Sequence, residues 1–254
     1  MTTQLKKLRE RVRRHGFRNT LCAIALKLVN SVFVFRIFRG LYVEQPNVSF
    51  FKCPPGLTAG FLSTPQLREY AHDPGTEMPD TFIDVALPRG HECHAIREGE
   101  TLAAYGWYAT GPTRVGIAQL EIAFDPRYVY MYKGFTVPRY RGQRLYAIGM
   151  TRALRHYKNR GYQGLVNYVE AQNAASLKSC LRMGYRMFGS IYLIGVFGKY
   201  FSFCSPGCER FDFRLIHRPS GTPVFTIGKT VSEKRRAPSE PSRSGAAATA
   251  RSPG

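Results

Sequence analysis

A short basic segment, Val137–Leu145, has a composition suited to binding phosphate. It follows a hydrophobic run, Tyr128–Val137, contains one proline, one glycine and three arginines, and leads into a helical pattern that ends at Gly161. Backbone N–H groups at a helix start have no partner within the helix, and the helix dipole adds positive potential there. The segment therefore predicts a loop for a phosphate or pyrophosphate, as in a nucleotide-type cofactor. The alternative is a basic, solvated turn.

Two groups of cysteine and histidine could be metal ligands, but neither is complete. Cys204 and Cys208, with His217 beyond, could be half of a zinc site whose second half is missing. His91 and His94 are three residues apart at the expected start of a strand, where we predict solvated surface. None of the six cysteines forms a C-x-x-C pair. We therefore expect reduced thiols in a cytosolic protein and no metal.

The elements that must position the basic segment follow a recognisable order. Strand patterns come first, at Leu41–Val43, in a hairpin with its tip at Glu98–Glu100, and at Arg114–Phe124. Then come the strand Tyr128–Val137, the loop, a helix over Leu145–Arg160 that turns residues 150, 153, 154 and 157 inward, and the strand Leu165–Val169. A second helix begins at Asn173, with Leu177, Cys180 and Leu181 inward, and a strand-rich stretch, Tyr185–Phe203, follows. This order predicts an α/β (α+β) fold, with a mixed, mostly antiparallel central sheet flanked by helices.

The two ends of the chain differ from this central part. Much of the net charge of +20 comes from residues 1–40, which carry ten lysines and arginines and one acid. An interrupted apolar stretch, Leu21–Phe38, lies within them and predicts neither a spanning helix nor a signal peptide. It suits a membrane-surface anchor or a helix packed on its own domain. Residues 229–254 are rich in serine, proline, alanine and arginine, which predicts disorder. We expect one domain at residues 41–228, in a cytoplasmic protein held near an anionic membrane by its N-terminus.

Two motifs resemble those of the GNAT superfamily of acyl-CoA N-acyltransferases. The family's phosphate loop commonly reads Pro-x-Tyr-Arg-Gly-x-Gly after the fourth strand, and this chain has Pro138-Arg-Tyr-Arg-Gly-Gln-Arg144. The second motif is an asparagine, a small residue or serine, then Gly-Phe/Tyr, matched by Asn173, Ser176 and Gly184-Tyr185. The resemblance covers the element order from Leu41 to Phe203. The chain departs from the pattern at Arg144 and Tyr146, where small residues are usual, and at Cys180, where a tyrosine often serves as general acid.

The resemblance implies acetyl-CoA, or another acyl-CoA, as co-substrate. Backbone amides of the loop would bind its pyrophosphate, and the strand before the loop would offer backbone partners to the pantetheine arm. Asn173 and Ser176 belong to the same site. The implied cofactor-binding residues of the strand and loop are Phe135, Thr136, Val137, Arg141, Gly142, Gln143, Arg144, Leu145 and Tyr146.

Acylation of an amine needs a base to remove a proton and an acid to protonate the leaving thiolate. Two carboxylates have suitable places in the element order, Glu121 and the preferred candidate Glu170. Tyr168, one strand repeat before Glu170, or Tyr185 could supply the acid. Each carboxylate could instead be a surface ion pair. Other tyrosines, among them Tyr132, could line an acceptor pocket or fill the sheet.

Three functions remain open at this point. The first is acyl transfer from acyl-CoA to a small amine, such as an amino sugar or envelope precursor. The second uses an acyl carrier protein as donor, since Arg152, Arg155 and Lys158 form a cationic helix face. The third is a non-catalytic module whose basic surface binds membrane or nucleic acid. The tails do not interleave aromatic and basic residues, which argues against single-stranded nucleic acid.

Overall fold

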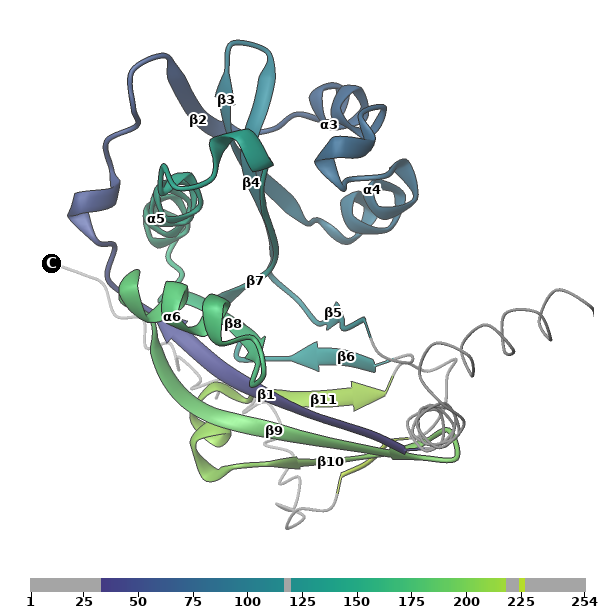
Figure 1. The fold of residues 1–254 in the computed structure, drawn as a ribbon. Helices are drawn as coiled ribbons and strands as arrows, with labels where there is room; N and C mark the ends of the chain where they lie inside the picture. The colour runs from purple at the N-terminus through teal and green to yellow at the C-terminus, as the bar shows by residue number, and fades with distance from the viewer. Residues whose placement is uncertain (1–32, 117–119, 218–223, 227–254) are drawn as a thin grey trace, which may run out of the picture.

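The computed structural model describes residues 33–116, 120–217 and 224–226 (Figure 1). Its strands are β1 Phe33–Val43, β2 Leu57–Phe61, β3 Glu92–Glu98, β4 Thr101–Ala109, β5 Thr113–Arg114, β6 Leu120–Ala123, β7 Tyr128–Thr136, β8 Gly164–Glu170, β9 Arg186–Val196, β10 Lys199–Cys204, β11 Arg214–His217 and β12 Val224–Thr226. Its helices are α3 Thr64–Ala71, α4 Asp80–Ala86, α5 Leu145–Asn159 and α6 Ala174–Arg182. No helix in the described ranges is long and apolar enough to cross a membrane.

A nine-stranded sheet organises the fold. Its order is β12-β10-β9-β1-β8-β7-β4-β3-β2, and a smaller sheet has the order β11-β6-β5. In the large sheet, β7 with β8 and β10 with β12 are parallel pairs, while the other neighbours are antiparallel. The expected mixed, mostly antiparallel sheet flanked by helices is confirmed.

The sheet opens between β7 and β8. These strands pair only from Tyr128 to Tyr130 with Gly164 to Val166, and beyond that point they diverge (Figure 1). The opening divides the sheet into an upper part, β2-β3-β4-β7, and a lower part beginning at β8. Helix α5 covers one face of the upper part, and α3 and α4 cover the other. The edge of β7 that faces β8 is therefore left without a neighbouring strand over most of its length.

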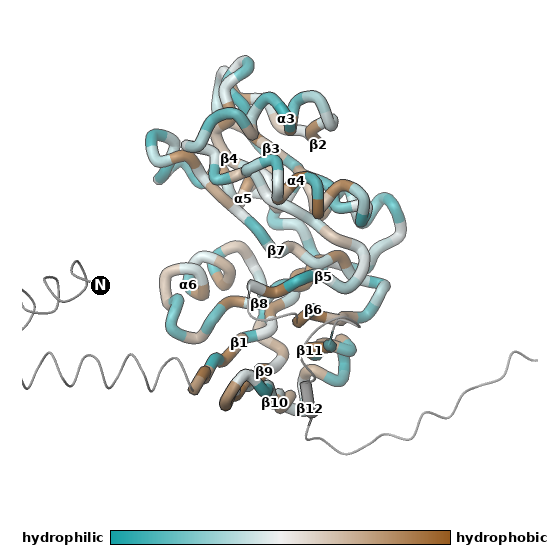
Figure 2. The backbone as a smooth tube through the Cα atoms, turned by 90° about the vertical axis from the view of Figure 1, so that its right-hand side faces the viewer, coloured by the Kyte–Doolittle hydropathy of each residue, from teal (hydrophilic) through white to brown (hydrophobic). Residues whose placement is uncertain are grey.

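The two faces of the lower part have different covers. Helix α6 lies on one face, and the small sheet packs on the other through Leu120, Ile122 and Leu215, which share a core cluster with Ile191 and Leu193 of β9. Figure 2 shows hydrophobic residues gathered along β6, β11 and β9. Burial of this apolar surface fixes the small sheet beside the opening.

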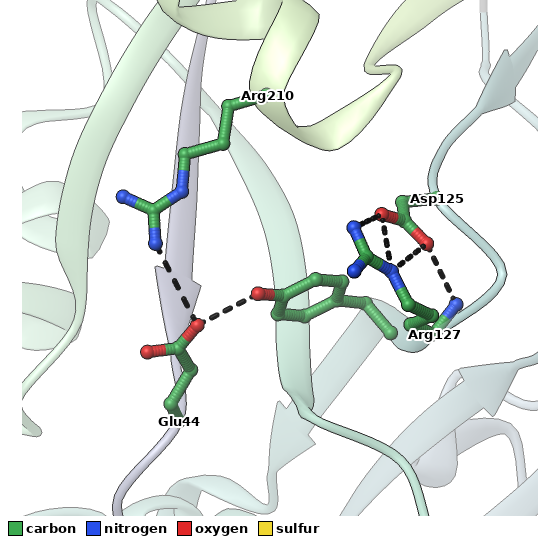
Figure 3. Close-up of polar contacts among 5 residues, drawn as sticks. Glu44, Asp125, Arg127 and Arg210 are labelled. Carbon is green, nitrogen blue, oxygen red and sulfur yellow. Dashed lines mark hydrogen bonds and ion pairs between the residues drawn. The ribbon is translucent and has the colours of Figure 1, made fainter.

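Polar contacts fix the start of β7 (Figure 3). The Tyr128 hydroxyl donates to Glu44 Oε1 at 2.7 Å, and a guanidinium nitrogen of Arg210 lies 4.0 Å from the same oxygen. The Asp125 carboxylate accepts from the backbone N–H of Arg127 at 2.9 Å and from its Nε. These hydrogen bonds lower the pKa of Asp125 from its ordinary value. They hold the end of β1 and the β6–β7 connection beside the paired start of β7.

Helix α5 matches its predicted face. The four residues expected inward are all buried, namely Met150, Ala153, Leu154 and Tyr157. The helix ends before Gly161, whose φ of 91° is the left-handed conformation that favours glycine. In α6, Cys180 is buried as predicted, but Leu181 is 52% exposed, so its predicted inward position was wrong. The buried face of α6 is therefore narrower than its sequence pattern predicts.

Two predicted boundaries differ from the structure. Residues 33–40 belong to β1, which lies between β8 and β9, so the sheet begins before the boundary expected at residue 41. The single strand expected at Arg114–Phe124 is two short strands, β5 and β6, which pair with each other in the small sheet. The remainder of the basic N-terminal segment, residues 1–32, and the tail, 229–254, lie outside the described residues.

Candidate functional site

A cavity of about 790 Å³ occupies the opening between β7 and β8 on the side of α5 and α6. Its walls include Gly134 and Thr136 of β7, Tyr168 and Glu170 of β8, and Asn173 and Ser176 at the start of α6. The structure thus brings the strand before the predicted loop, Tyr146 after the loop and the start of the second motif to one cavity, whereas residues 137–145 do not line it. Asn173 also caps α6, because its Oδ1 accepts a hydrogen bond from the Ser176 N–H at 3.1 Å.

The open edge of β7 presents backbone groups to this cavity. The Val137 N–H donates to the Ala103 carbonyl of the neighbouring strand at 3.0 Å, so it is not available to a ligand. Backbone groups alternate in direction along a strand, which turns those of Thr136 and Gly134 towards the opening. Arg141 Nε donates to the Thr136 carbonyl at 3.3 Å. Of the predicted strand residues, Thr136 keeps an available N–H, while Val137 does not.

The loop after β7 ends at a helix start that lacks a cap. Arg144 is the N-cap residue, no side chain caps α5, and its first turn contains no acidic residue. Gly142 and Arg144 have φ values of 84° and 60°. A left-handed conformation at a non-glycine residue costs roughly 1 kcal/mol, which accounts for the family's preference for glycine at the position of Arg144. The result is a set of free N–H groups beside three exposed arginines, Arg139, Arg141 and Arg144.

The loop is tied to the β3–β4 hairpin. The Tyr140 side chain is buried, and its hydroxyl donates to Glu98 Oε2 at 2.6 Å. Leu145 is buried in the same region, whereas Gln143 is exposed. Residues on either side of the free N–H groups are therefore anchored, so the loop is held in shape before any ligand binds.

Tyr146 is accommodated by a glycine on the facing strand. A Cβ added at Gly134 would lie closer than 3.0 Å to the Tyr146 ring and to Met131. The Tyr146 hydroxyl contacts Met131 Sδ at 3.2 Å. The ring therefore packs against β7 at Gly134 and forms part of the cavity wall. The cavity has a volume of about 790 Å³ with the Tyr146 side chain in its wall. A tyrosine at this position, where the family usually has a small residue, therefore does not close the site.

The proposed catalytic residues divide into two groups. Glu170 and Tyr168 line the cavity. Glu170 Oε2 accepts from Arg36 at 2.8 Å and also contacts Gln172. Tyr185 is buried in the core beside Cys180 and does not line the cavity.

Glu121 lies elsewhere, on β6 of the small sheet. It is buried, and its Oε1 accepts from Arg89 at 2.8 Å. Glu121 therefore forms an ion pair with Arg89 and does not line the cavity beside α6.

Cys180 takes the position where the family often has a tyrosine. Asn167 Nδ2 lies 3.8 Å from its Sγ, and burial raises the pKa of the thiol. The thiol form is therefore favoured at neutral pH. A protonated thiol beside the cavity wall is a poor nucleophile, which agrees with a packing role.

A second cavity, of about 530 Å³, lies on the opposite side of the opening, between α4 and β5. Tyr132 and Tyr168 line both cavities, so their side chains mark the junction between the cavities.

A β-bulge in β7 explains the position of Tyr132. Trp107 pairs with Lys133 and Tyr108 with Met131, which leaves Tyr132 as the extra residue. Tyr132 and Lys133 consequently both reach the second cavity, although neighbours on a regular strand face opposite sides.

His91 contacts Tyr132 at this junction. The His91 Nδ1 and the Tyr132 hydroxyl are 2.8 Å apart. Burial, assisted by the charge of Arg89, lowers the pKa of His91 to about 4, so the imidazole is neutral at neutral pH. The Tyr132 hydroxyl donates to Nδ1 in the tautomer that leaves this nitrogen unprotonated. The prediction of a solvated surface at His91 and His94 was wrong, because both side chains are buried.

The described part of the chain contains no group of three or more histidine, cysteine, aspartate or glutamate side chains arranged to hold a metal. His91 instead pairs with a tyrosine, and Cys204 donates to the Phe213 carbonyl at 3.7 Å.

The comparisons with known proteins show a family resemblance. The model of the acetyltransferase (GNAT) family matches residues 62–185, a span that holds the bulged strand, the loop, α5, β8 and α6. The resemblance found in the sequence is confirmed over this part of the chain. No curated protein matches the chain.

Several solved structures are similar. A putative GNAT-family acetyltransferase from Novosphingobium aromaticivorans is 18% identical, with a TM-score of 0.44, over 65% of this chain and 66% of that one. A GCN5-related N-acetyltransferase from Kribbella flavida is 16% identical, with a TM-score of 0.42, over 68% and 63%. Another, from Sphaerobacter thermophilus, is 13% identical, with a TM-score of 0.44, over 67% and 54%. The alignments cover only part of these relatives, between 54% and 66% of each chain.

Sequence reasoning missed the pair formed by His91 and Tyr132. Tyr132 was considered only as a general pocket or sheet residue, and His91 as surface. The one available signal was the position of His91 directly after Gly90, where a chain re-enters a sheet. The bulge that aims Tyr132 at His91 has no signature in the hydrophobic pattern of β7.

Proposed function

We propose that the protein is an acyl-CoA N-acyltransferase that binds its donor in the cavity between β7 and α6 and its amine acceptor in the cavity between α4 and β5. The observation that carries this proposal is that Tyr132 and Tyr168 line both cavities. A reaction between two separately held substrates needs such a junction, because the reacting atoms must come together in a defined geometry. We call the two spaces the donor cavity and the acceptor cavity.

The donor cavity and the loop beside it fit coenzyme A. Free N–H groups at the start of α5 and the arginines of the loop suit a pyrophosphate. The N–H groups of Thr136 and Gly134 suit the amide groups of a pantetheine arm, which can pair with an open strand edge. Asn173 and Ser176 border the same space. Among the predicted loop residues, Arg141, Gly142, Arg144 and Tyr146 are those we assign to this role, with Leu145 and Gln143 contributing backbone.

Acyl-CoA would supply an acyl group activated as a thioester. The protein's part is to hold the amine and to take the proton that the nitrogen loses as the amide bond forms. We assign this to Tyr132, whose hydroxyl can accept the proton from the amine while passing its own to His91 Nδ1. Glu170 is less suited to this step, because it lines only the donor cavity and is bonded to Arg36.

Tyr168 is the remaining candidate for the acid. Its side chain is half-buried at the junction. Burial and the charge of Glu170 raise its pKa to about 12, so it keeps its proton at neutral pH. It can therefore donate a hydrogen bond to the leaving sulfur. Tyr185 is withdrawn from this role, because it reaches neither cavity.

A carrier-protein donor has less support than coenzyme A. Arg152 Nε donates to the Phe51 carbonyl at 3.0 Å, and the Arg155 guanidinium lies 4.5 Å from the centre of the Phe51 ring. Lys158 Nζ contacts the Gln163 carbonyl. The cations that suggested a docking face are thus engaged with their own chain.

Acetyl-CoA should raise the melting temperature of the protein. A ligand at 100 times its dissociation constant stabilises the folded state by about 2.7 kcal/mol, which differential scanning fluorimetry detects. Ser179→Trp, which places an indole in the donor cavity from an exposed site on α6, should remove the shift. The matched change Leu181→Trp, on the solvent side of the same helix, should keep it. No shift in the unchanged protein at millimolar acetyl-CoA, or an undiminished shift in Ser179→Trp, would contradict the assigned donor cavity.

A further inference from the structure

The acceptor cavity carries positive charge without matching negative charge. Its walls include Lys133, Arg89 and Arg114, and no aspartate or glutamate among the described residues lines it. Arg89 is paired with Glu121 and also donates to the Pro112 carbonyl at 2.9 Å. Lys133 and Arg114 form no ion pair with any described carboxylate. Lys133 and Arg114 are therefore the cations of the cavity without an ion-pair partner among the described residues, although the charge of Glu77 acts on Lys133 and Glu121 lies opposite Arg114 in the strand register.

Lys133 is held in the cavity by the shape of its strand. The bulge at Tyr132 turns Lys133 towards α4, where its Nζ lies 4.9 Å from the centre of the Phe82 ring. The side chain is half-buried, and burial lowers the pKa of its ammonium group. A half-buried ammonium without a bonded carboxylate is destabilising to the free protein. An anion beside it would offset that penalty and restore the pKa.

The other walls of the cavity are apolar and aromatic. Phe82, Val85 and Ala86 of α4 face Tyr130 and Val115. Phe82 is fixed by an edge contact with Trp107, with ring centres 5.0 Å apart. Such walls suit a flat or branched apolar group, and the desolvation they cause strengthens a hydrogen-bonded ion pair in the same space.

We propose that the acceptor is a small amine that also carries an anionic group and an apolar, ring-like group. Its anion lies against Lys133 and Arg114, its apolar part against Phe82, and its amine at the junction formed by Tyr132. The inference rests on the proposed acyltransferase function and specifies the acceptor of that reaction. The chemistry balances: the amine nitrogen forms a bond to the acyl carbon, the carbon–sulfur bond breaks, the amine proton passes to Tyr132 and His91, and the thiolate takes up a proton.

The same arrangement disfavours polycationic amines. A polyamine or an amino sugar with several ammonium groups would bring further positive charge to Lys133 and Arg114, with no free carboxylate among the described wall residues to receive it. Repulsion between like charges in a partly buried space weakens binding. An anion in the cavity also raises the pKa of the neighbouring His91, which makes the imidazole a better proton acceptor when the acceptor is bound.

The test compares amines that differ only in the anionic group. L-Phenylalanine, L-phenylalaninamide, phenethylamine and spermidine are titrated calorimetrically into the full chain without any donor. Phenylalanine should bind about tenfold more tightly than its amide or phenethylamine, the difference expected for a charge-assisted hydrogen bond. Lys133→Met should abolish this preference, Lys133→Arg should retain most of it, and the exposed Lys199→Met should leave it unchanged.

The possible results distinguish failure of the anionic-acceptor proposal from failure of the acyltransferase proposal on which it rests. Equal or tighter binding of phenethylamine or spermidine overturns the anionic acceptor, even if acetyl-CoA acylates those amines. A preference for phenylalanine that survives Lys133→Met overturns the assigned position of the anion. A Lys133-dependent preference supports the inference, and if acetyl-CoA then yields no acylated product, it is the acyltransferase proposal that fails.

Discussion

Replacement of Tyr132 by phenylalanine should lower kcat for acyl transfer about a hundredfold, because a positioned general acid or base contributes typically 10²–10⁴-fold. The change removes the hydroxyl that lies 2.8 Å from His91 Nδ1 and keeps the ring that separates the two cavities. Because only the proton path is lost, the melting-temperature shift caused by acetyl-CoA should remain. Steady-state kinetics and thermal melts on the same preparation measure both quantities.

Tyr192→Phe is the matched control for this substitution. Tyr192 lies on β9 and lines neither cavity, so its loss of a hydroxyl should leave kcat within about twofold of the unchanged protein. If Tyr132→Phe behaves like Tyr192→Phe, the hydroxyl at the junction takes no part in proton transfer. Glu170 would then become the better candidate for the base, with its contact to Arg36 as the feature to examine.

Replacement of Gly164 by alanine should destabilise the protein by about 3 kcal/mol, at the upper end of the range for overpacking. A Cβ there would lie closer than 3.0 Å to the backbone carbonyl oxygen of Val43. A backbone atom in the middle of a sheet cannot rotate away, so β1 and β8 must separate where β8 also pairs with β7. Urea unfolding should show a lower midpoint. For a chain of this size, the melting temperature should fall by roughly 6–12 °C.

Gly60→Ala provides the comparison. Gly60 is also in a strand, does not have a positive φ, and has nothing within 4 Å of an added Cβ. Its replacement should be neutral or stabilising by about 0.4–1 kcal/mol, because alanine restricts the unfolded chain. An unfolding midpoint for Gly164→Ala equal to that of Gly60→Ala would show that β1 and β8 are not packed as closely as described.

The regular elements of the upper part of the sheet could be predicted from the sequence because each has a local signal. The hairpin of β3 and β4 has a glycine turn, α5 has a helical period that ends at Gly161, and β7 has a continuous apolar run. Strand β1 lacked such a signal. Its residues 33–40 are apolar with Arg36 and Arg39 interspersed, a pattern that suits an amphipathic segment equally well. Only pairing with β8 and β9, which are distant in sequence, decides its structure.

The donor side of the site was more predictable than the acceptor side. A loop with the composition suited to phosphate is a local sequence feature, so Arg141–Tyr146 could be proposed from the sequence, as could Asn173 and Ser176 from the second motif. The acceptor cavity joins α4, β5 and a bulge in β7. None of these has a strong pattern, and the bulge reverses the direction in which Lys133 points. Glu121, the second candidate for the base, lies away from the donor cavity for a related reason, since its strand belongs to the small sheet.

The most direct test of the central claim, that this chain transfers an acyl group from coenzyme A to an amine, is thiol release from acetyl-CoA measured with an amine panel and intact-mass analysis of the products. We expect thiol release that depends on the amine, a product in which one acetyl group replaces one amine hydrogen, and the fastest reaction with an amine that also bears a carboxylate. Thiol release no faster than in buffer, for every amine and for longer acyl-CoA donors as well, would contradict it.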